Sequence, residues 1–413
     1  MSRKRAQRTY DHRLLCLLQE TGDITIATRL GVPRSPTGDR GEALAIRRAP
    51  PRQEGSPIRQ RFDATITVVR RRCFTLVLAG LSLLLSPLSI AAAEPAQSKT
   101  ASLDASRELQ ALHDDDQRDQ NTPEADALTR EFLLRQVKRR DRVMEILRDY
   151  ELSIALDFRN AALLLQHGSK SGDYLLAHAL ACAAIFEDDA VPFGKFLCGA
   201  TLDRFLVRLG RAQCFGSQGT DPTQPDSGSN ATLPLGDGIR GELGFGPGGA
   251  AKGKGAEKKA AAKKTPSAKD LPSRFKEMQK DANSSQPGDE KAAERRRARA
   301  AWALDLLKAG EFQKPEQWFQ AASLAAEASA PDDLLVAHLA AVVAAVRGHA
   351  SARPLAARTL DQWLVAIGEP QRFGTEPEGG AARKEPPDSS WPACLRKAHD
   401  LPPRAPEATP PGK

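Results

Sequence analysis

Aromatic side chains are scarce in this chain: they make up 5% of its 413 residues, and only four are tryptophan and three tyrosine. The formal charge of +8 does not gather into one basic patch interleaved with aromatic residues but spreads over arms and linkers. Such a distribution does not favour nucleic-acid recognition. We therefore expect no specific nucleic-acid partner.

Several motifs that would identify a reaction are also missing. The chain has no glycine-rich phosphate loop, no C-x-x-C and no H-E-x-x-H. His113 precedes three aspartates, but no second cluster of ligands accompanies it. We expect no cofactor and no metal site, and the sequence leaves open whether the protein is an enzyme.

What the chain does contain is alanine and leucine at helical spacing. Its hydrophobic fraction is 40%, and its 29 prolines and 31 glycines lie largely between the apolar stretches. No window shows the alternation of apolar and polar residues that a strand requires. The predicted fold is all-α: two tandem related helical-bundle domains joined by a disordered linker, with disordered N- and C-terminal segments.

Residues 1–36 contain two short apolar segments separated by Gly22-Asp23, followed by a turn at residues 31–35. They resemble the N-terminal helix-turn-helix of bacterial transposases. Pro36, Gly38 and Gly41 cannot sustain the recognition helix that should follow. We interpret residues 1–36 as a truncated remnant, or as upstream sequence included by a too-early start codon, and residues 37–67 as disordered.

Residues 68–93 have the three parts of a secretory signal. Arg70, Arg71 and Arg72 precede an apolar run over residues 73–90, and an A-x-A site ends at Ala93. Cleavage there would release a chain beginning at Glu94. An uncleaved run would instead be an inner-membrane anchor, because it is just long enough to span. We expect an extracytoplasmic (periplasmic or secreted) or membrane-anchored protein, with membrane contact only through residues 73–93.

A block of sequence recurs about 160 residues later, which predicts a duplicated domain. The matching pairs are Ala161 and Ala321, Asp173 and Asp333, His178 and His338, Thr201 and Thr359, Asp203 and Asp361, Gln213 and Gln371, and Phe215 and Phe373. We predict copy one at residues 122–247 and a degenerate copy two at residues 291–376. Residues 94–121, 248–290 and 377–413 are expected to be a disordered lead-in, a linker with a short helix at residues 273–280, and a Pro-rich, mostly disordered tail.

Helix start and stop signals divide each copy into about four helices. Thr122 and Pro123 predict the first start, and Gly210 and Gly368 predict the last ends. The helices expected in copy one cover residues 122–150, 158–167, 173–186 and 191–209. Those expected in copy two cover residues 292–309, 315–329, 332–347 and 351–367.

Copy one carries Gln166-His167, Asp203-Arg204 and Gln213-x-x-Gly216-Ser217-Gln218. With these residues it resembles an uncharacterised bacterial family of all-helical domains, which has a Q-H pair, a D-R pair and Q-x-x-G-T-Q. The family has no known activity. In copy two, Glu327, Gln362 and Glu376 stand in place of His167, Arg204 and Gln218.

These residues give two hypotheses. His167, Asp203 and Arg204 could converge as a catalytic site with a His base and an anion-binding Arg, with Gln166, Gln213 and Gln218 binding a ligand. Alternatively they are structural, as an ion pair and helix-end caps. We favour the structural hypothesis. In either case we expect only copy one to carry a polar cluster, with His167 near Asp203 or Arg204, and Glu327 more solvated than His167.

The remaining candidates lie inside helices. His178 and His338 are interpreted as core histidines whose hydrogen bonds are satisfied. Cys182 and Cys198 flank one loop, so a helical hairpin could bring them together as a disulfide or as unpaired buried thiols.

Taken together, the sequence favours an exported helical binding or scaffold protein with an unknown ligand or protein partner. An enzyme with a His/Asp/Arg site in copy one is the alternative. A DNA-binding protein derived from a transposase is a second alternative, which the missing recognition helix disfavours.

Export is directly testable. Fractionation followed by N-terminal sequencing should find mature protein outside the cytoplasm, beginning near Glu94, because the segment from Arg70 to Ala93 contains every part of a cleavable signal. Full-length soluble protein in the cytoplasm would contradict this prediction.

Overall fold

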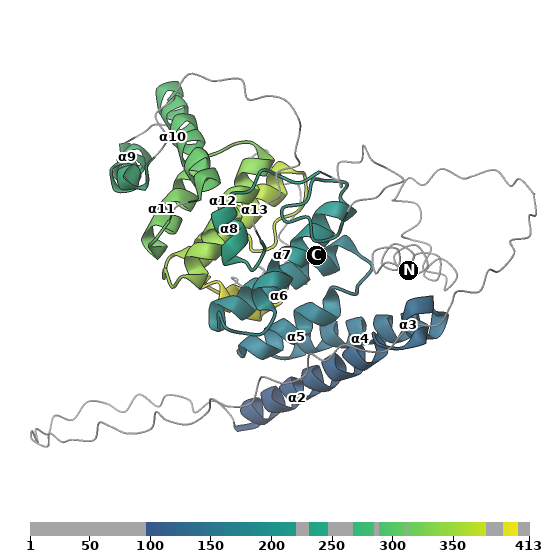
Figure 1. Ribbon diagram of the computed structural model, residues 1–413. Coiled ribbons are helices and arrows are strands. Elements are labelled where there is room, and N and C mark those ends of the chain that lie inside the picture. Colours follow the sequence, from purple (N-terminus) through teal and green to yellow (C-terminus); the bar gives the residue numbers. More distant parts are fainter. Residues whose placement is uncertain are drawn as a thin grey trace, which may run out of the picture. The chain divides into compact units, whose positions relative to one another are not determined.

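Helices are the regular elements in the part of the chain that the computed structural model describes. It covers residues 96–219, 231–246, 267–284, 289–310, 312–376 and 391–403 (Figure 1). Within these ranges no strand forms, and one isolated bridge pairs Gln213 with Thr232. The predicted all-α class is confirmed. The helix-turn-helix remnant and the signal segment with its cleavage site between Ala93 and Glu94 lie outside the described residues.

We call residues 96–246 the first half and residues 267–403 the second half. The first half contains α2 (Ala96–Asp119), α3 (Pro123–Ala127), α4 (Arg130–Asp149), α5 (Ala155–Leu165), α6 (Ser171–Glu187), α7 (Gly194–Arg208) and α8 (Asp237–Glu242). The second half contains η2 (Ala268–Asp270), α9 (Leu271–Ser284), α10 (Glu290–Ala309), α11 (Pro315–Ala325), α12 (Pro331–Val346), α13 (Ala352–Ala366) and α14 (Ala393–Ala398).

The first predicted helix is in fact two. Thr122 caps α3 as expected, its side chain accepting a hydrogen bond from the Ala125 N–H. The helix then ends because Leu128 adopts a left-handed conformation (φ 48°), and Thr129 caps the start of α4. Leu128 packs in a small apolar cluster with Phe132. Burial of the Leu128 side chain offsets the cost of its backbone conformation.

Helices α6 and α12 form the centres of the two halves. α6 packs between α5 and α7, and α12 packs between α11 and α13. Nearly all side chains of both are buried, and many are alanine, which lets the neighbouring helices approach closely. The helices that follow end where the sequence predicts, with left-handed Gly210 (φ 68°) and Gly368 (φ 84°).

The lead-in at residues 94–121 was predicted to be disordered, and that prediction is wrong for residues 96–119. They form α2, which lies along α4 and α5 (Figure 1). Ala105 and Leu109 are buried and supply its apolar contact. Its acidic end is not simply solvated, because Asp119 pairs with Arg135 and Arg139 of α4.

Two further segments predicted to be disordered contain helices. Within the linker, α9 begins at the buried Leu271 and packs on α11, with Phe275 meeting Phe319 edge to face. Within the C-terminal tail, α14 buries Cys394 and Leu395. The helix expected in the linker at residues 273–280 is therefore present and longer, at residues 271–284, whereas α14 was not expected in the tail.

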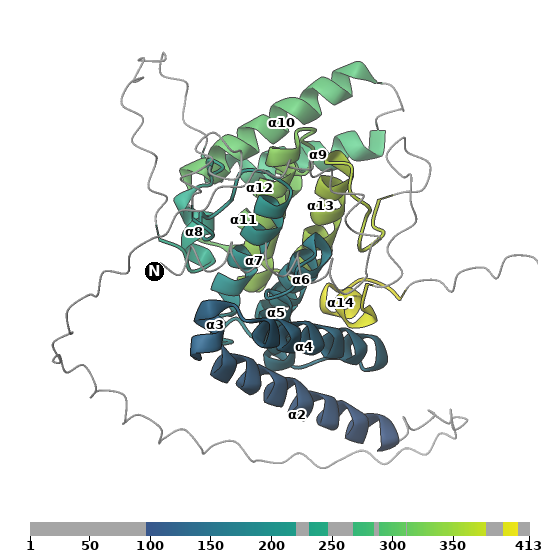
Figure 2. The same ribbon diagram turned by 90° about the vertical axis from the view of Figure 1, so that its right-hand side faces the viewer.

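The two halves exchange short helices (Figure 2). α8 of the first half packs against α10 and α12 of the second, and α14 of the second half packs against α6 of the first. Gly238 is required for the first contact, since a Cβ there would lie 2.7 Å from the Gly310 carbonyl oxygen. In the second contact, the buried His399 ring lies against Phe186 and Phe373. Each half therefore contributes to the core of the other.

His399 makes this core sensitive to acid. Burial lowers the pKa of His399 from 6.5 to about 4. Between pH 6.5 and pH 4, His399 is therefore protonated in the unfolded chain but neutral in the folded protein. Stability should fall as the pH drops from about 6.5 to about 4. Between pH 7 and pH 4.5, urea unfolding should show wild type losing about 2 kcal/mol more than His399→Phe. Equal losses in the two proteins would refute a neutral buried His399.

Candidate functional site

Asp203, a predicted catalytic residue, holds the turn that follows α7. Its side chain is fully buried. The backbone N–H groups of Cys214 and Phe215 donate to Oδ1 at 2.7 and 3.1 Å, and the N–H and hydroxyl of Ser217 donate to Oδ2 at 2.8 Å. Burial raises the pKa of the Asp203 carboxyl, and these hydrogen bonds oppose that shift. The lone pairs of this carboxylate are thus engaged in holding the turn.

The neighbouring motif residues extend the same structure. Arg204 donates to the Gln166 carbonyl and, at 3.0 Å, to the side-chain oxygen of Gln218. Gln213 donates to the Gly219 carbonyl and accepts from the Gln218 N–H, both at 3.0 Å. These contacts join the end of α5, helix α7 and the turn after it. The Gln166 backbone, rather than its side chain, provides the link.

We call a buried carboxylate that accepts hydrogen bonds from the turn after its own helix a clamp, and the second half contains one as well. Asp361 accepts from the N–H groups of Arg372, Phe373 and Thr375 and from the Thr375 hydroxyl, and Gln371 accepts from the Glu376 N–H. Asp361 is as buried as Asp203. The exchanged helices close both turns: Arg240 of α8 donates to the carbonyls of Cys214 and Phe215, and Arg396 of α14 donates to that of Phe373.

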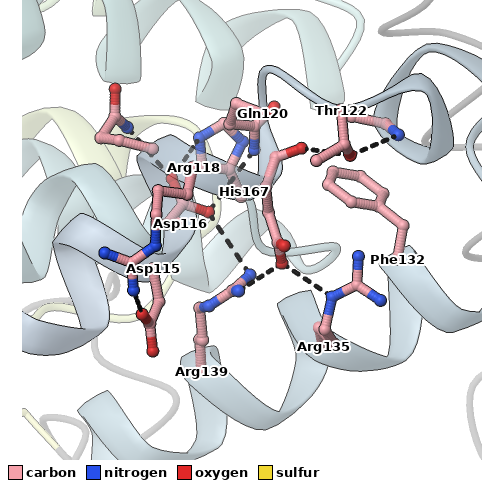
Figure 3. A network of polar contacts seen from close by, with 12 residues as sticks. Asp115, Asp116, Arg118, Gln120, Thr122, Phe132, Arg135, Arg139 and His167 are labelled. Carbon is pink, nitrogen blue, oxygen red and sulfur yellow. Dashed lines mark hydrogen bonds and ion pairs between the residues drawn. The ribbon is translucent and has the colours of Figure 1, made fainter.

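His167 does not meet Asp203 directly; its carboxylate partner is Asp116 of α2 (Figure 3). The His167 Nε2 lies 3.6 Å from the Asp116 Oδ2, and the Asp116 side chain is only 1% exposed. Burial lowers the pKa of His167; the cations Arg204 and Arg139 act in the same direction, and Asp116 opposes them. The expected neighbour Arg204 is thus present, while the expected Asp203 is replaced by Asp116.

Asp116 and Arg139 were missed as site residues because α2 was expected to be disordered. Arg139 lies 3.9 Å from Asp116 and also bonds Asp119. A signal for this cluster was present in the sequence: Arg135 and Arg139 recur as Arg295 and Arg299, with the offset of the other matching pairs.

A polar cluster was expected in copy one alone, and this was wrong, because the second half has a cluster built on the matching arginines. Arg299 donates to Asp281 and to Glu327, which stands in place of His167. Asp281 pairs with Arg299 as Asp119 pairs with Arg139, and the residue three positions before it is Met278, whereas Asp116 lies three positions before Asp119. Glu327 was expected to be more solvated than His167, and this was wrong: both side chains are 15% exposed, because Glu327 pairs with Arg299.

His178 and His338 meet between the two halves. Both are buried, and their Nε2 atoms lie 3.0 Å apart. The Nδ1 of His178 bonds the Cys198 carbonyl and that of His338 bonds the Ala356 carbonyl, each at 2.9 Å. The core interpretation of both residues agrees with their burial, but their contact across the halves was not predicted.

Cys182 and Cys198 lie beside this histidine pair. Their sulfurs are 3.4 Å apart and both are free thiols in this structure, so the disulfide stays a prediction. The hydrogen bond from Cys182, together with the His178 ring, lowers the pKa of the Cys198 thiol to about 5. Burial raises the pKa of the Cys182 thiol.

A cavity of about 440 Å³ lies in the second half. Its lining includes Phe319, Ser323, Arg358 and Arg396. His167 is not among the lining residues, so this cavity gives no support to a catalytic role for His167.

Comparisons with family models, curated proteins and solved structures gave no match. The resemblance of residues 122–247 to an uncharacterised bacterial helical family therefore stays a prediction. Among the described helices, none combines the length and apolar character needed to cross a membrane.

The Asp203 clamp can be tested against its counterpart. Asp203→Ala and Asp361→Ala should each lower the free energy of unfolding by about 3 kcal/mol, because each leaves buried backbone donors without acceptors. Asp203→Asn keeps one acceptor oxygen and should cost less. Urea unfolding measures all three, and a loss below about 1 kcal/mol in both alanine variants would contradict the clamp.

Proposed function

We propose that the chain is an exported helical binding or scaffold protein, built from two copies of one helical domain, that contacts its partner through exposed phenylalanines on copy one. The main support for a non-catalytic role is that the motif residues make structural hydrogen bonds. Asp203, Arg204, Gln213 and Gln218 are engaged within copy one in holding a turn and the ends of helices. The motif is therefore better explained as a stabilising element of the domain than as a catalytic centre.

The matched contacts of the two halves support the duplication. Asp203 and Asp361 hold equivalent turns, and Arg139 and Arg299 occupy equivalent acidic surroundings. Copy two has Glu327 and Gln362 in place of His167 and Arg204, yet its Asp361 still holds the turn. A structural role of the motif is consistent with this loss. Export is supported by the sequence pattern at residues 68–93, with anchoring in the inner membrane as the alternative.

A row of four phenylalanines, which we call the phenylalanine ladder, is the proposed contact surface. Phe193 and Phe196 have ring centroids 4.9 Å apart, Phe196 stacks on Phe245 at 5.0 Å, and Phe245 stacks on Phe215 at 4.2 Å. Phe193 is 57% exposed and Phe196 is 37% exposed. In a chain with so few aromatic residues, two adjacent exposed rings are a strong sign of a contact surface.

The backbone at Phe193 supports the same conclusion. Phe193 has a φ of 68°, a left-handed conformation that costs a side-chain-bearing residue about 1 kcal/mol or more. An exposed ring recovers little of that cost by packing. Strain of this kind in a surface residue points to selection for something other than stability.

An enzyme is the second candidate, favoured by the 3.6 Å contact between His167 and Asp116. In this case His167, held neutral by burial, would be the base, and Asp116 would orient it. This candidate requires that His167→Gln abolish function while changes to the phenylalanine ladder leave it intact. The binding proposal requires the reverse.

The binding proposal is tested by photo-crosslinking in intact cells. A photoreactive phenylalanine at position 193 should give a discrete crosslinked product, and adding Phe196→Ser should remove it. The matched control is the same probe at Ile154, an exposed apolar residue (48%) that is not part of the ladder, which should give none. Phe193→Gly should not lower the free energy of unfolding, because glycine accepts the left-handed backbone. A destabilised Phe193→Gly, or equal products at positions 193 and 154, would refute the proposal.

A further inference from the structure

The contact between His178 and His338 has an electrostatic requirement. Because a carbonyl oxygen only accepts, the Nδ1 of each ring must carry the proton that it donates to Cys198 or Ala356. When both imidazoles are neutral, each has only this one proton, and each Nε2 therefore carries a lone pair. Burial lowers the pKa of His178 but Cys198 raises it more, so a proton on the His178 Nε2 is the alternative to a metal ion. The two Nε2 atoms nevertheless face each other at 3.0 Å. Two lone pairs repel at this distance unless a positive species lies between them.

Cys182 supplies a third donor atom at the same place. It lies four residues after His178, on the same face of α6, and its sulfur is 3.7 Å from the His178 Nε2. The Cys182 sulfur and the Nε2 atoms of His178 and His338 all lie within 4.8 Å of one another.

Two of the three separations between these atoms are close to the edges of a metal coordination sphere. With metal–nitrogen bonds of about 2.0–2.1 Å and metal–sulfur bonds of about 2.3 Å, tetrahedral ligands are about 3.3 Å apart for two nitrogens and about 3.6 Å for nitrogen and sulfur. The observed values are 3.0 Å between the nitrogens and 3.7 Å from nitrogen to sulfur. Small side-chain movements would complete the geometry.

The outer contacts also fit a metal site. A histidine that ligates through one nitrogen usually donates its other N–H to a carbonyl or carboxylate, which fixes the ring orientation. His178 and His338 both do so, on carbonyls at equivalent places of α7 and α13. The donor set of two imidazoles and one thiolate is typical of soft and borderline ions with filled d shells.

We propose that His178, Cys182 and His338 bind one d10 metal ion, Cu⁺ or Zn²⁺, between the two halves. Binding replaces the thiol proton of Cys182, which leaves to solvent. The ion links α6 to α12 and removes the repulsion between the two Nε2 lone pairs.

Cys198 distinguishes the two ions. Cu⁺ with one thiolate and two imidazoles is neutral and needs no fourth ligand. Zn²⁺ prefers four ligands and, in a buried site, a second thiolate to neutralise it. The Cys198 sulfur is 3.4 Å from that of Cys182 and would have to rotate towards the ion. Cys198→Ser should therefore leave Cu⁺ affinity within a few fold and weaken Zn²⁺ binding.

The test uses the reduced full-length chain with Cu⁺ or Zn²⁺ alone, measured by chelator competition and native mass spectrometry. Wild type should bind one ion, and both His338→Gln and Cys182→Ser should weaken binding by more than about tenfold. His399→Gln and Cys214→Ser are the matched controls, because each changes a buried residue outside the cluster, and both should bind as wild type does.

Because a variant of a buried residue can fail to fold, wild type is also loaded with Co²⁺. Thiolate ligation should then give a near-ultraviolet charge-transfer band, which needs no variant to interpret. Absence of stoichiometric binding by either ion and of the cobalt band would overturn the proposal and leave a proton shared between the two histidines. Binding that is unchanged in a folded His338→Gln would overturn it as well.

Discussion

Helices α6 and α12 are buried around almost their whole circumference, and this constraint decides where polar groups can lie in the rest of the structure. A helix enclosed on all sides has no solvated face, so its neighbours must supply every hydrogen bond that its polar side chains need. His178 and His338 meet this demand through carbonyls of α7 and α13 and through each other. Two other buried carboxylates, Asp157 and Asp173, lie in the first turns of α5 and α6, where free backbone donors are available.

The buried carboxylates Asp203 and Asp361 follow from the same constraint. A turn that closes over a buried helix cannot leave its N–H groups to water, so a carboxylate from α7 or α13 accepts them. The arginines of the exchanged helices then satisfy carbonyls of the same turns. In both turns, the carboxylate of Asp203 or Asp361 accepts from backbone N–H groups, and the arginine of the short helix donates to backbone carbonyls.

Local signals predicted much of the fold. Thr122, Gly210 and Gly368 act as the caps and stops that the sequence suggested, because their effect depends on neighbouring residues alone. Helix α2 was missed because its polarity is typical of a solvated segment, and its pairing with α4 depends on residues about 20 positions away. The meeting of His178 with His338 was beyond local reasoning for the same reason. Spacing identified them as matching residues, but only tertiary packing brings them into contact.

The exchange of α8 and α14 makes the integrity of each half depend on the other. Each short helix bonds the turn of the half it follows in sequence and also packs against helices of the other half, so it covers apolar surface of both. A cut in the backbone between residues 246 and 267 would leave both exchanged contacts in place. The two fragments would remain associated as a non-covalent pair, while either fragment alone would present an uncovered apolar surface to solvent. The covalent connection between the halves thus raises the effective concentration of one half near the other. The contacts of α8 and α14 stabilise the association of the two halves.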